Sequence, residues 1–248
     1  YYSGWGNGRG QEIYGVYYLT FSVYAYTQAP YQVRQAVADS PLGDFTKISP
    51  ADGGRIIGTD SSWASIASAG HHCFIECGDE LIIAYHTFLN RTDITDGRAL
   101  AVDKITWVTN SNGQRVMHAN GPTYSYQPLP QEITGYSDLA PMADITVNNA
   151  DESSKAEYLN DGVLKIHNTD LAEEFITSGG NTVITLQFDK FVLVRSVMIY
   201  NSIYWDYAFG GINKIELRYK NGYNSTDTVE LTGLEYDFDW NTDTFQQV

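Results

Sequence analysis

The sequence predicts an all-β protein built from two β domains. Its composition is rich in the residues of pleated sheets and tight turns, with 19 Tyr, 10 Phe, 5 Trp and 22 Gly in 248 residues. Strand signals separated by turn signals recur about every 10 to 15 residues, which is the rhythm of propeller blades or sandwiches. We find no convincing amphipathic helix in the pattern of apolar residues.

The first half of the sequence is typical of short antiparallel strands. A turn followed by a strand occupies residues 13–22, and its antiparallel partner occupies 32–38. The run Ser40-Pro41-Leu42-Gly43-Asp44 between this pair and the next strands is a turn sequence. Further strands are predicted at 72–76, 81–86, 98–107 and 115–118.

A proline-marked stretch, 121–130, separates these strands from a second series. We place the domain boundary near residues 131–137, with one domain over 1–135 and another over 138–248. The longer strands of the second series favour a jelly-roll β-sandwich, whose last strand is not evident in 234–248. These strands are predicted at 145–147, 183–188, 191–200 and 212–219.

The charge of the chain narrows the range of partners. Its net charge is −15 at pH 7, and such a surface repels phosphate backbones, so nucleic acid is not an expected partner. No apolar run is long enough to predict a membrane span. Cys73 and Cys77 would lie roughly 13 Å apart on one strand, too far for a disulfide. The sequence starts at Tyr1 without Met or a signal peptide, so we expect a processed chain or a fragment.

Four segments, in order along the chain, carry a family resemblance. The segments are YYLTFS at 17–22 with ADSPLGDF at 38–45, GHHCF at 70–74, AYH at 84–86, and GRALAVDKITW at 97–107. They resemble the blade and strand-end motifs of the family 43 glycoside hydrolases, with a Cys in the second motif where the family usually has Ser. GPT at 121–123 with QPLP at 127–130 resembles the end of that family's catalytic domain.

The resemblance implies a five-bladed β-propeller and an inverting mechanism. Two carboxyl groups flank the sugar in such a mechanism, one as general base on water and one as general acid on the leaving oxygen. Only the last two or three blades fit before the boundary, so the base and the carboxylate that tunes the acid are expected upstream of Tyr1. The acid is expected upstream of Tyr1 as well, which leaves no catalytic residue in this chain; the alternative is Glu12, the one candidate acid that the chain contains.

The resemblance also implies roles for residues that are present. His71 matches a histidine that holds a cation, usually calcium, or water in the central channel; a hydrogen-bonded core histidine is the other interpretation. Arg98 matches an arginine that contacts the substrate; the other interpretation is that Arg98 forms a surface salt bridge. Trp5, with Tyr24 and Tyr26, is a stacking platform at the pocket mouth or simply blade packing. His72 is expected to pack between blades, and Asp103 and Lys104 are expected to be structural.

Three segments of the second domain carry another resemblance: Asn160-Asp161-Gly162, VLVRSVMIYN at 192–201 and INKIEL at 212–217. They resemble discoidin-like, galactose-binding sandwiches. A calcium ion near Asp161 is a further expectation. Tyr204, Trp205 and Tyr207 form an aromatic cluster that is expected to bind sugar or to pack against the propeller.

Together these features predict the C-terminal part of an exo-glycosidase. Its substrates are expected to be α-L-arabinofuranosyl or β-xylosyl units of plant arabinoxylan or arabinan, with calcium as the cofactor. Its expected partner is the N-terminal fragment of the same gene product, held non-covalently, in the extracellular or periplasmic space of a bacterium. The alternatives are a non-catalytic carbohydrate-binding protein and a structural partner chain.

Overall fold

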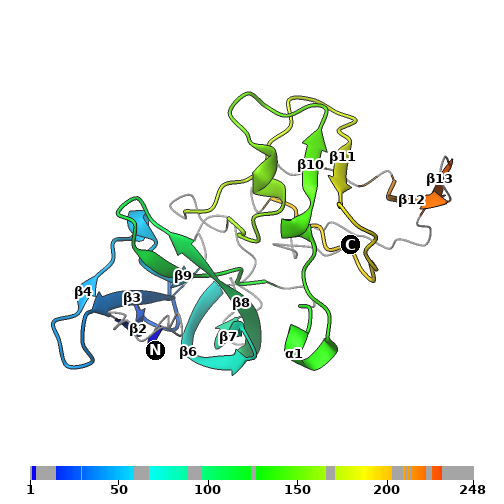
Figure 1. The fold of residues 1–248 in the computed structure, drawn as a ribbon. Helices are drawn as coiled ribbons and strands as arrows, with labels where there is room; N and C mark the ends of the chain where they lie inside the picture. The colour runs from blue at the N-terminus through cyan, green and yellow to red at the C-terminus, as the bar shows by residue number, and fades with distance from the viewer. Residues whose placement is uncertain are drawn as a thin grey trace. The chain divides into compact units, whose positions relative to one another are not determined.

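Antiparallel strands dominate the computed structural model (Figure 1). It describes residues 2–3, 15–28, 30–58, 67–88, 97–123, 127–165, 171–202, 209, 212, 214–221 and 225–230. Helices in these ranges are single turns, such as α1 (Gln131–Thr134), so the prediction of a mostly β protein is confirmed. None of the helices in these ranges is long and apolar enough to cross a bilayer.

The chain divides into two compact units. The first comprises Tyr1–Thr123, Gln127–Ser137 and Val163–Glu173, and the second comprises Tyr124–Tyr126, Asp138–Gly162 and Glu174–Val248. The returning segment of the first unit is tied to β9 (Arg115–Ala119) and the residue after it. His118 Nε2 lies 2.7 Å from the Leu164 carbonyl oxygen, and the Leu164 N–H donates to Asn120 Oδ1.

The first sheet of the first unit is centred on a long hairpin. Strand β2 (Val16–Val23) pairs with β3 (Gln32–Ala38), from Tyr17 opposite Ala38 to Val23 opposite Gln32. This pair confirms the strand predicted within 13–22 and its antiparallel partner at 32–38. The sheet is completed by β1 (Tyr2–Ser3) beside β2, and by β4 (Thr46–Lys47) and β5 (Arg55–Ile57) beside β3.

The second sheet is a four-stranded meander. Its strands are β6 (Ala67–Cys77), β7 (Glu80–Phe88), β8 (Ala99–Thr109) and β9, in that order. The register of β6 against β7 shifts on both sides of Gly70, and Ser68 and His71 adopt positive φ values of 61° and 53°. These irregularities set the direction of the side chains at the start of β6.

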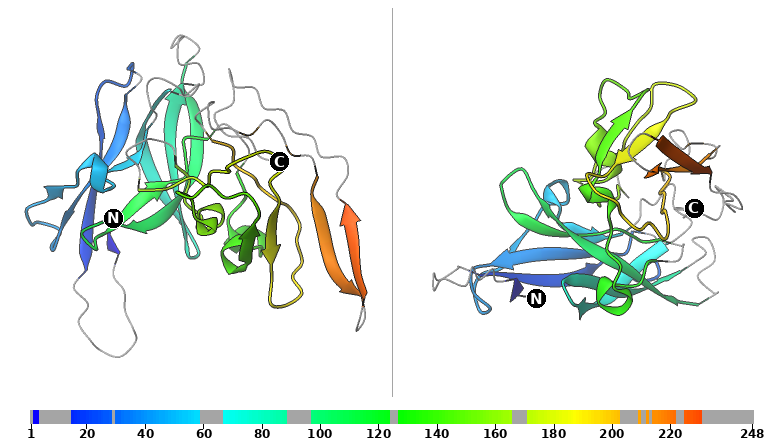
Figure 2. Two further views of the ribbon diagram at one scale, coloured as in Figure 1. Left: turned by 90° about the horizontal axis from the view of Figure 1, so that it is seen from above. Right: turned by 45° about the vertical axis from the view of Figure 1, so that its right-hand side comes forward.

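The two sheets of the first unit lie side by side and share one core (Figure 2). A buried glutamine, Gln35, joins them: its amide donates to the Gly53 and Met117 carbonyl oxygens and accepts the Met117 N–H. Each hydrogen-bonding group of this side chain is therefore used, which is what makes its burial tolerable. The apolar core consists of Tyr18, Val33, Ile56, Ile57, Ala69, Leu81, Ile83, Tyr85, Ile105, Met117 and Ala119.

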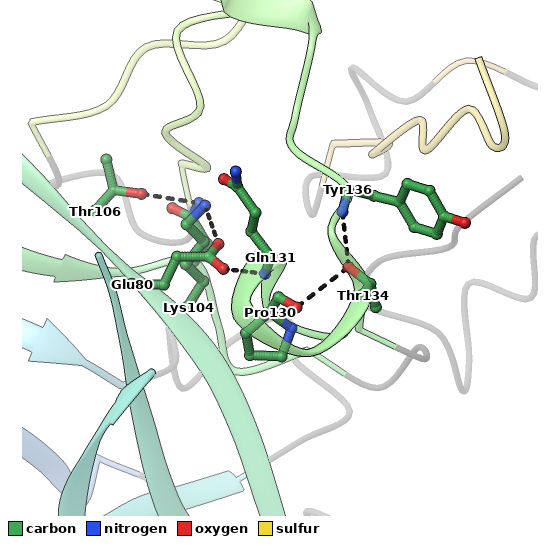
Figure 3. Close-up of polar contacts among 8 residues, drawn as sticks. Glu80, Lys104, Thr106, Pro130, Gln131, Thr134 and Tyr136 are labelled. Carbon is green, nitrogen blue, oxygen red and sulfur yellow. Dashed lines mark hydrogen bonds and ion pairs between the residues drawn. The ribbon is translucent and has the colours of Figure 1, made fainter. Parts of the chain in front are cut away.

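The short helix α1 is attached to the second sheet through Glu80 (Figure 3). One carboxylate oxygen accepts the Gln131 N–H at 2.6 Å, and the other lies 2.7 Å from Lys104 Nζ. Partial burial raises the pKa of Glu80, but the hydrogen bonds from Lys104 and Gln131 outweigh it and lower the pKa overall. Lys104 therefore has the structural role that the sequence predicts.

The described part of the second unit contains two separate hairpin-like pairs. Strand β10 (Asp144–Val147) pairs with β11 (Ile184–Gln187), and β12 (Glu216–Asn221) pairs with β13 (Ser225–Glu230). Residues 191–200, predicted as a strand, are not a strand here. That prediction is wrong because apolar, β-branched composition favours an extended chain without supplying a ladder partner. The jelly-roll arrangement stays a prediction.

Candidate functional site

The strands of the first unit bring several of their ends to one edge. Strands β2 and β7 end at Val23 and Phe88, and β3 and β8 begin at Gln32 and Ala99. Because neighbouring strands are antiparallel, the end of one coincides with the start of the next. We call this region the histidine edge. It is defined by Tyr24, Tyr26, Tyr31, His71, His86 and Arg98.

Two hydrogen bonds from β6 join the sheets beside the histidine edge. The His71 N–H donates to Ser22 Oγ at 3.0 Å, and His72 Nε2 lies 2.8 Å from Thr20 Oγ1. Burial, and after it the charge of His71, lowers the pKa of His72 to about 4. The His72 ring is therefore neutral at pH 7, and it packs between the two sheets as the sequence predicts.

A glycine makes room for the aromatic part of the edge. A Cβ on Gly70 would overlap Cε1 of Tyr31 and lie 2.6 Å from its Cδ1. The Tyr31 ring is only 9% exposed and stacks on His86, with the ring centroids 5.6 Å apart. The glycine of the GHHCF motif therefore has a packing role. Sequence reasoning did not single out Tyr31 or His86, although His86 closes the AYH motif.

His71 stands at the surface of this edge. Its backbone is left-handed, with φ of 53°, and its exposed ring lies 6.1 Å from that of His86. Calcium prefers six to eight oxygen ligands. Among the residues that the structure describes, no three His, Cys, Asp or Glu side chains gather to hold a metal ion. The described residues thus do not fit a calcium site, and the ion stays a prediction of the family resemblance.

Arg98 lies at the start of β8 and contacts an aromatic ring. Its guanidinium carbon is 5.4 Å from the centroid of the Tyr26 ring, the distance of a cation–π interaction. The structure therefore places Arg98 against Tyr26 and in no salt bridge with a described residue. Partial burial, then Arg98 and His71, lower the pKa of His86. Arg98, His71 and His86 are thus close enough to influence one another electrostatically.

Carboxyl groups are absent from the described strand segments of the histidine edge. Residues 20–28, 30–34, 67–74, 84–88 and 97–101 contain neither Asp nor Glu. Glu12 and Trp5, named above as candidate acid and stacking residue, lie outside the described residues. The pair of carboxyl groups that glycoside hydrolysis needs is therefore not found in these segments.

Three of the motif segments meet instead in a buried network around Asp103. The Tyr85 hydroxyl donates to Asp103 Oδ2 at 2.5 Å, and the Thr123 hydroxyl donates to Oδ1 at 2.5 Å. The Thr123 N–H also donates to Oδ2, at 3.3 Å, and a Cβ on Gly121 would overlap that oxygen. Burial raises the pKa of Asp103 to about 7 against the lowering effect of these bonds. Its enclosure makes Asp103 a structural residue, as expected.

The motif residues of the second unit that are described also have structural contacts. Asn160 Nδ2 donates to the carbonyl oxygens of Ala140 and Ala143. Asn201 is 4% exposed, and its side chain exchanges hydrogen bonds with both the N–H and the carbonyl of Phe209. These asparagines stabilise turns. The aromatic cluster Tyr204, Trp205 and Tyr207 lies outside the described residues, and the calcium near Asp161 stays a prediction.

Comparisons with known proteins give partial structural likenesses. No protein-family model matches the chain, and no curated protein sequence matches it. A thermostable family-43 glycoside hydrolase is 27% identical, with a TM-score of 0.38 over 46% of this chain and 34% of that one. An endo-1,4-beta-xylanase from Bacteroides thetaiotaomicron is 22% identical, with a TM-score of 0.33 over 41% and 33%.

A third likeness extends further along the chain. An endo-1,5-alpha-L-arabinanase from Thermotoga petrophila is 17% identical, with a TM-score of 0.32 over 75% of this chain and 45% of the arabinanase. The chain thus spans less than half the length of each of these three structures. Part of the chain is structurally similar to glycoside hydrolases, and its own activity is a matter for proposal.

Proposed function

We propose that this chain is the C-terminal part of an inverting exo-glycosidase of the family-43 type. It would release α-L-arabinofuranosyl or β-xylosyl units from plant arabinoxylan or arabinan, in the extracellular or periplasmic space of a bacterium. One observation carries the proposal. Gly70, His71, His86 and Arg98 come from three separate motif segments, and they lie together at the histidine edge.

The exposed side chains of this edge suit sugar binding. Tyr24 and Tyr26 are 58% and 52% exposed, so their rings are accessible to the C–H face of a sugar. Arg98 is held against Tyr26 and offers a planar set of N–H donors for hydroxyl groups. His71 adds an exposed imidazole that can donate or accept.

The catalytic carboxyl groups would come from an upstream segment of the same gene product. An open sheet face in the first unit supports a partner of this kind. Leu100 and Val102 alternate onto one face of β8, and Ile75 lies on the same face of β6 by register; they are 80%, 42% and 48% exposed. Apolar side chains grouped on a sheet face mark a surface that another element covers.

Sugar release from aryl arabinofuranoside and aryl xyloside tests the proposal. The substrates are given to this chain alone and to the chain produced together with its upstream segment. We expect release only from the pair, with the faster substrate identifying the sugar. Release by the chain alone would mean that its own residues, such as Glu12, supply the acid. No release from either preparation would contradict the enzyme and favour a carbohydrate-binding protein, which the absence of carboxyl groups at the described edge also supports.

Replacing Arg98 tests the site within the active pair. Arg98→Ala removes a charged donor, so we expect kcat/KM to fall about 10- to 100-fold without a change in thermal stability. Arg115→Ala is the matched control. Arg115 also lies over an aromatic ring, Trp107 at 4.7 Å, but it pairs with Thr109 at the opposite end of β8. Equal kinetics for the two variants would remove Arg98 from the site.

A further inference from the structure

We propose that the histidine edge recognises a carboxylate carried by the sugar, so that its ligand is a uronic-acid-bearing oligosaccharide. This inference rests on the proposed function only in taking the ligand to be a polysaccharide fragment. It goes beyond that function in naming a charged group on the ligand, with Arg98 as the main contact.

The charge of the edge is opposite to that of the chain. The whole chain carries 30 Asp and Glu against 15 Lys and Arg. The described segments of the edge contain the cations Arg34 and Arg98 but no acidic residue. Their histidines are not counted as charge, because burial lowers the pKa of His72 to about 4 and also lowers the pKa of His86. Charges beyond about 8 Å are screened at physiological salt, so a bound anion experiences mainly the local side chains. A local cationic surface in an acidic chain is therefore compatible with an anionic ligand.

Arg98 differs from three of the lysines that the structure describes, each of which is paired with a glutamate. Lys104 is paired with Glu80, Lys165 with Glu173 and Lys214 with Glu216. Arg98 instead lies over the Tyr26 ring and forms no ion pair with a residue that the structure describes. A guanidinium in this state can bind a carboxylate through two parallel hydrogen bonds, which are roughly twice as strong as bonds between neutral groups.

The neighbours of Arg98 make a sugar carboxylate a better fit than a free anion. The exposed faces of Tyr24 and Tyr26 offer stacking surface beside the guanidinium. His86 Nε2 is a buried nitrogen with no hydrogen-bond partner, and the exposed ring of His71 lies next to it. A uronic acid unit combines the two features that this surface would bind, an apolar ring face and an adjoining carboxylate.

Binding measurements on the full chain distinguish the contribution of the carboxylate to affinity from that of the sugar ring. The probes are a glucuronate-substituted xylo-oligosaccharide and the unsubstituted oligosaccharide of equal length, titrated calorimetrically at about 20 and 200 mM salt. We expect the acidic probe to bind about 10-fold more tightly, with an advantage that shrinks at the higher salt concentration. Arg98→Gln should abolish the advantage while Arg115→Gln retains it, and thermal melts would confirm that both variants fold.

Three results would overturn the inference. Equal binding of the two probes would leave a neutral sugar site, and the proposed hydrolase would stand. If neither probe binds, the histidine edge is not a uronate site, and this conclusion holds whatever the chain hydrolyses together with its upstream segment. Acetate and free glucuronate can be compared as competitors of the acidic probe. If both displace it at the same concentration, the sugar ring contributes nothing to affinity.

Discussion

Gly70→Ala is expected to destabilise the first unit by about 3 kcal/mol or more and to disrupt the histidine edge. The new Cβ would overlap Cε1 of Tyr31 and lie 2.6 and 2.7 Å from Cδ1 and Cζ of the same ring. That ring is buried and stacked on His86, so it cannot rotate away without opening the core. Urea denaturation of the variant and of the wild type measures the loss as a shift of the unfolding midpoint.

A double-mutant cycle assigns this loss to the ring. Tyr31→Ala removes the obstruction at its own cost of a few kcal/mol, so the double variant Gly70→Ala, Tyr31→Ala should be more stable than the two single losses predict. Gly179→Ala is the matched control, because a Cβ there meets no atom within 4 Å. If Gly70→Ala were as stable as this control, the Tyr31 ring would not lie over Gly70.

Much of the first unit could be predicted from sequence, because its signals are local. Alternating aromatic and β-branched residues ending in turn residues located the β2 and β3 strands and most of the second sheet. Residues 191–200 show the limit of this reasoning. Their composition favours a strand, but whether a strand forms depends on a partner, and composition does not identify one.

The sequence indicated which segments contribute to the candidate site, but it did not indicate how their side chains are arranged in space. The motifs indicated His71 and Arg98, but nothing local indicated that Tyr31 would lie over Gly70, 39 positions further along the chain. That contact depends on the register shifts of β6, where Ser68 and His71 take left-handed backbone angles. Positive φ values are uncommon for serine, and for histidine they are enriched but still the exception, so the bulge and the contacts that it sets required the structure.

The free energy of unfolding of the Asp103→Asn variant is expected to increase relative to that of the wild type as pH rises. Burial raises the folded-state pKa of Asp103 to about 7, from an ordinary value of 3.8. The folded state therefore takes up a proton that the unfolded state has released, and the contribution of Asp103 to stability is greatest below pH 3.8 and is lost as pH rises through 7. Asparagine is neutral throughout. Between pH 5 and 8 the free energy of unfolding of the wild type should fall by roughly 2 to 3 kcal/mol relative to that of the variant.

The same measurement decides between the two influences on Asp103. Burial favours the neutral acid, whereas donors from Tyr85 and Thr123 favour the carboxylate. Free energies of unfolding from urea titrations at pH 5 and 8 give the difference between wild type and variant at each pH. The exposed Asp79→Asn controls for the general effect of removing a carboxyl group and should stay within about 0.5 kcal/mol at both values. A difference for Asp103→Asn that does not change with pH would mean that the three donated hydrogen bonds outweigh burial, and that Asp103 stays ionised at its buried position on β8.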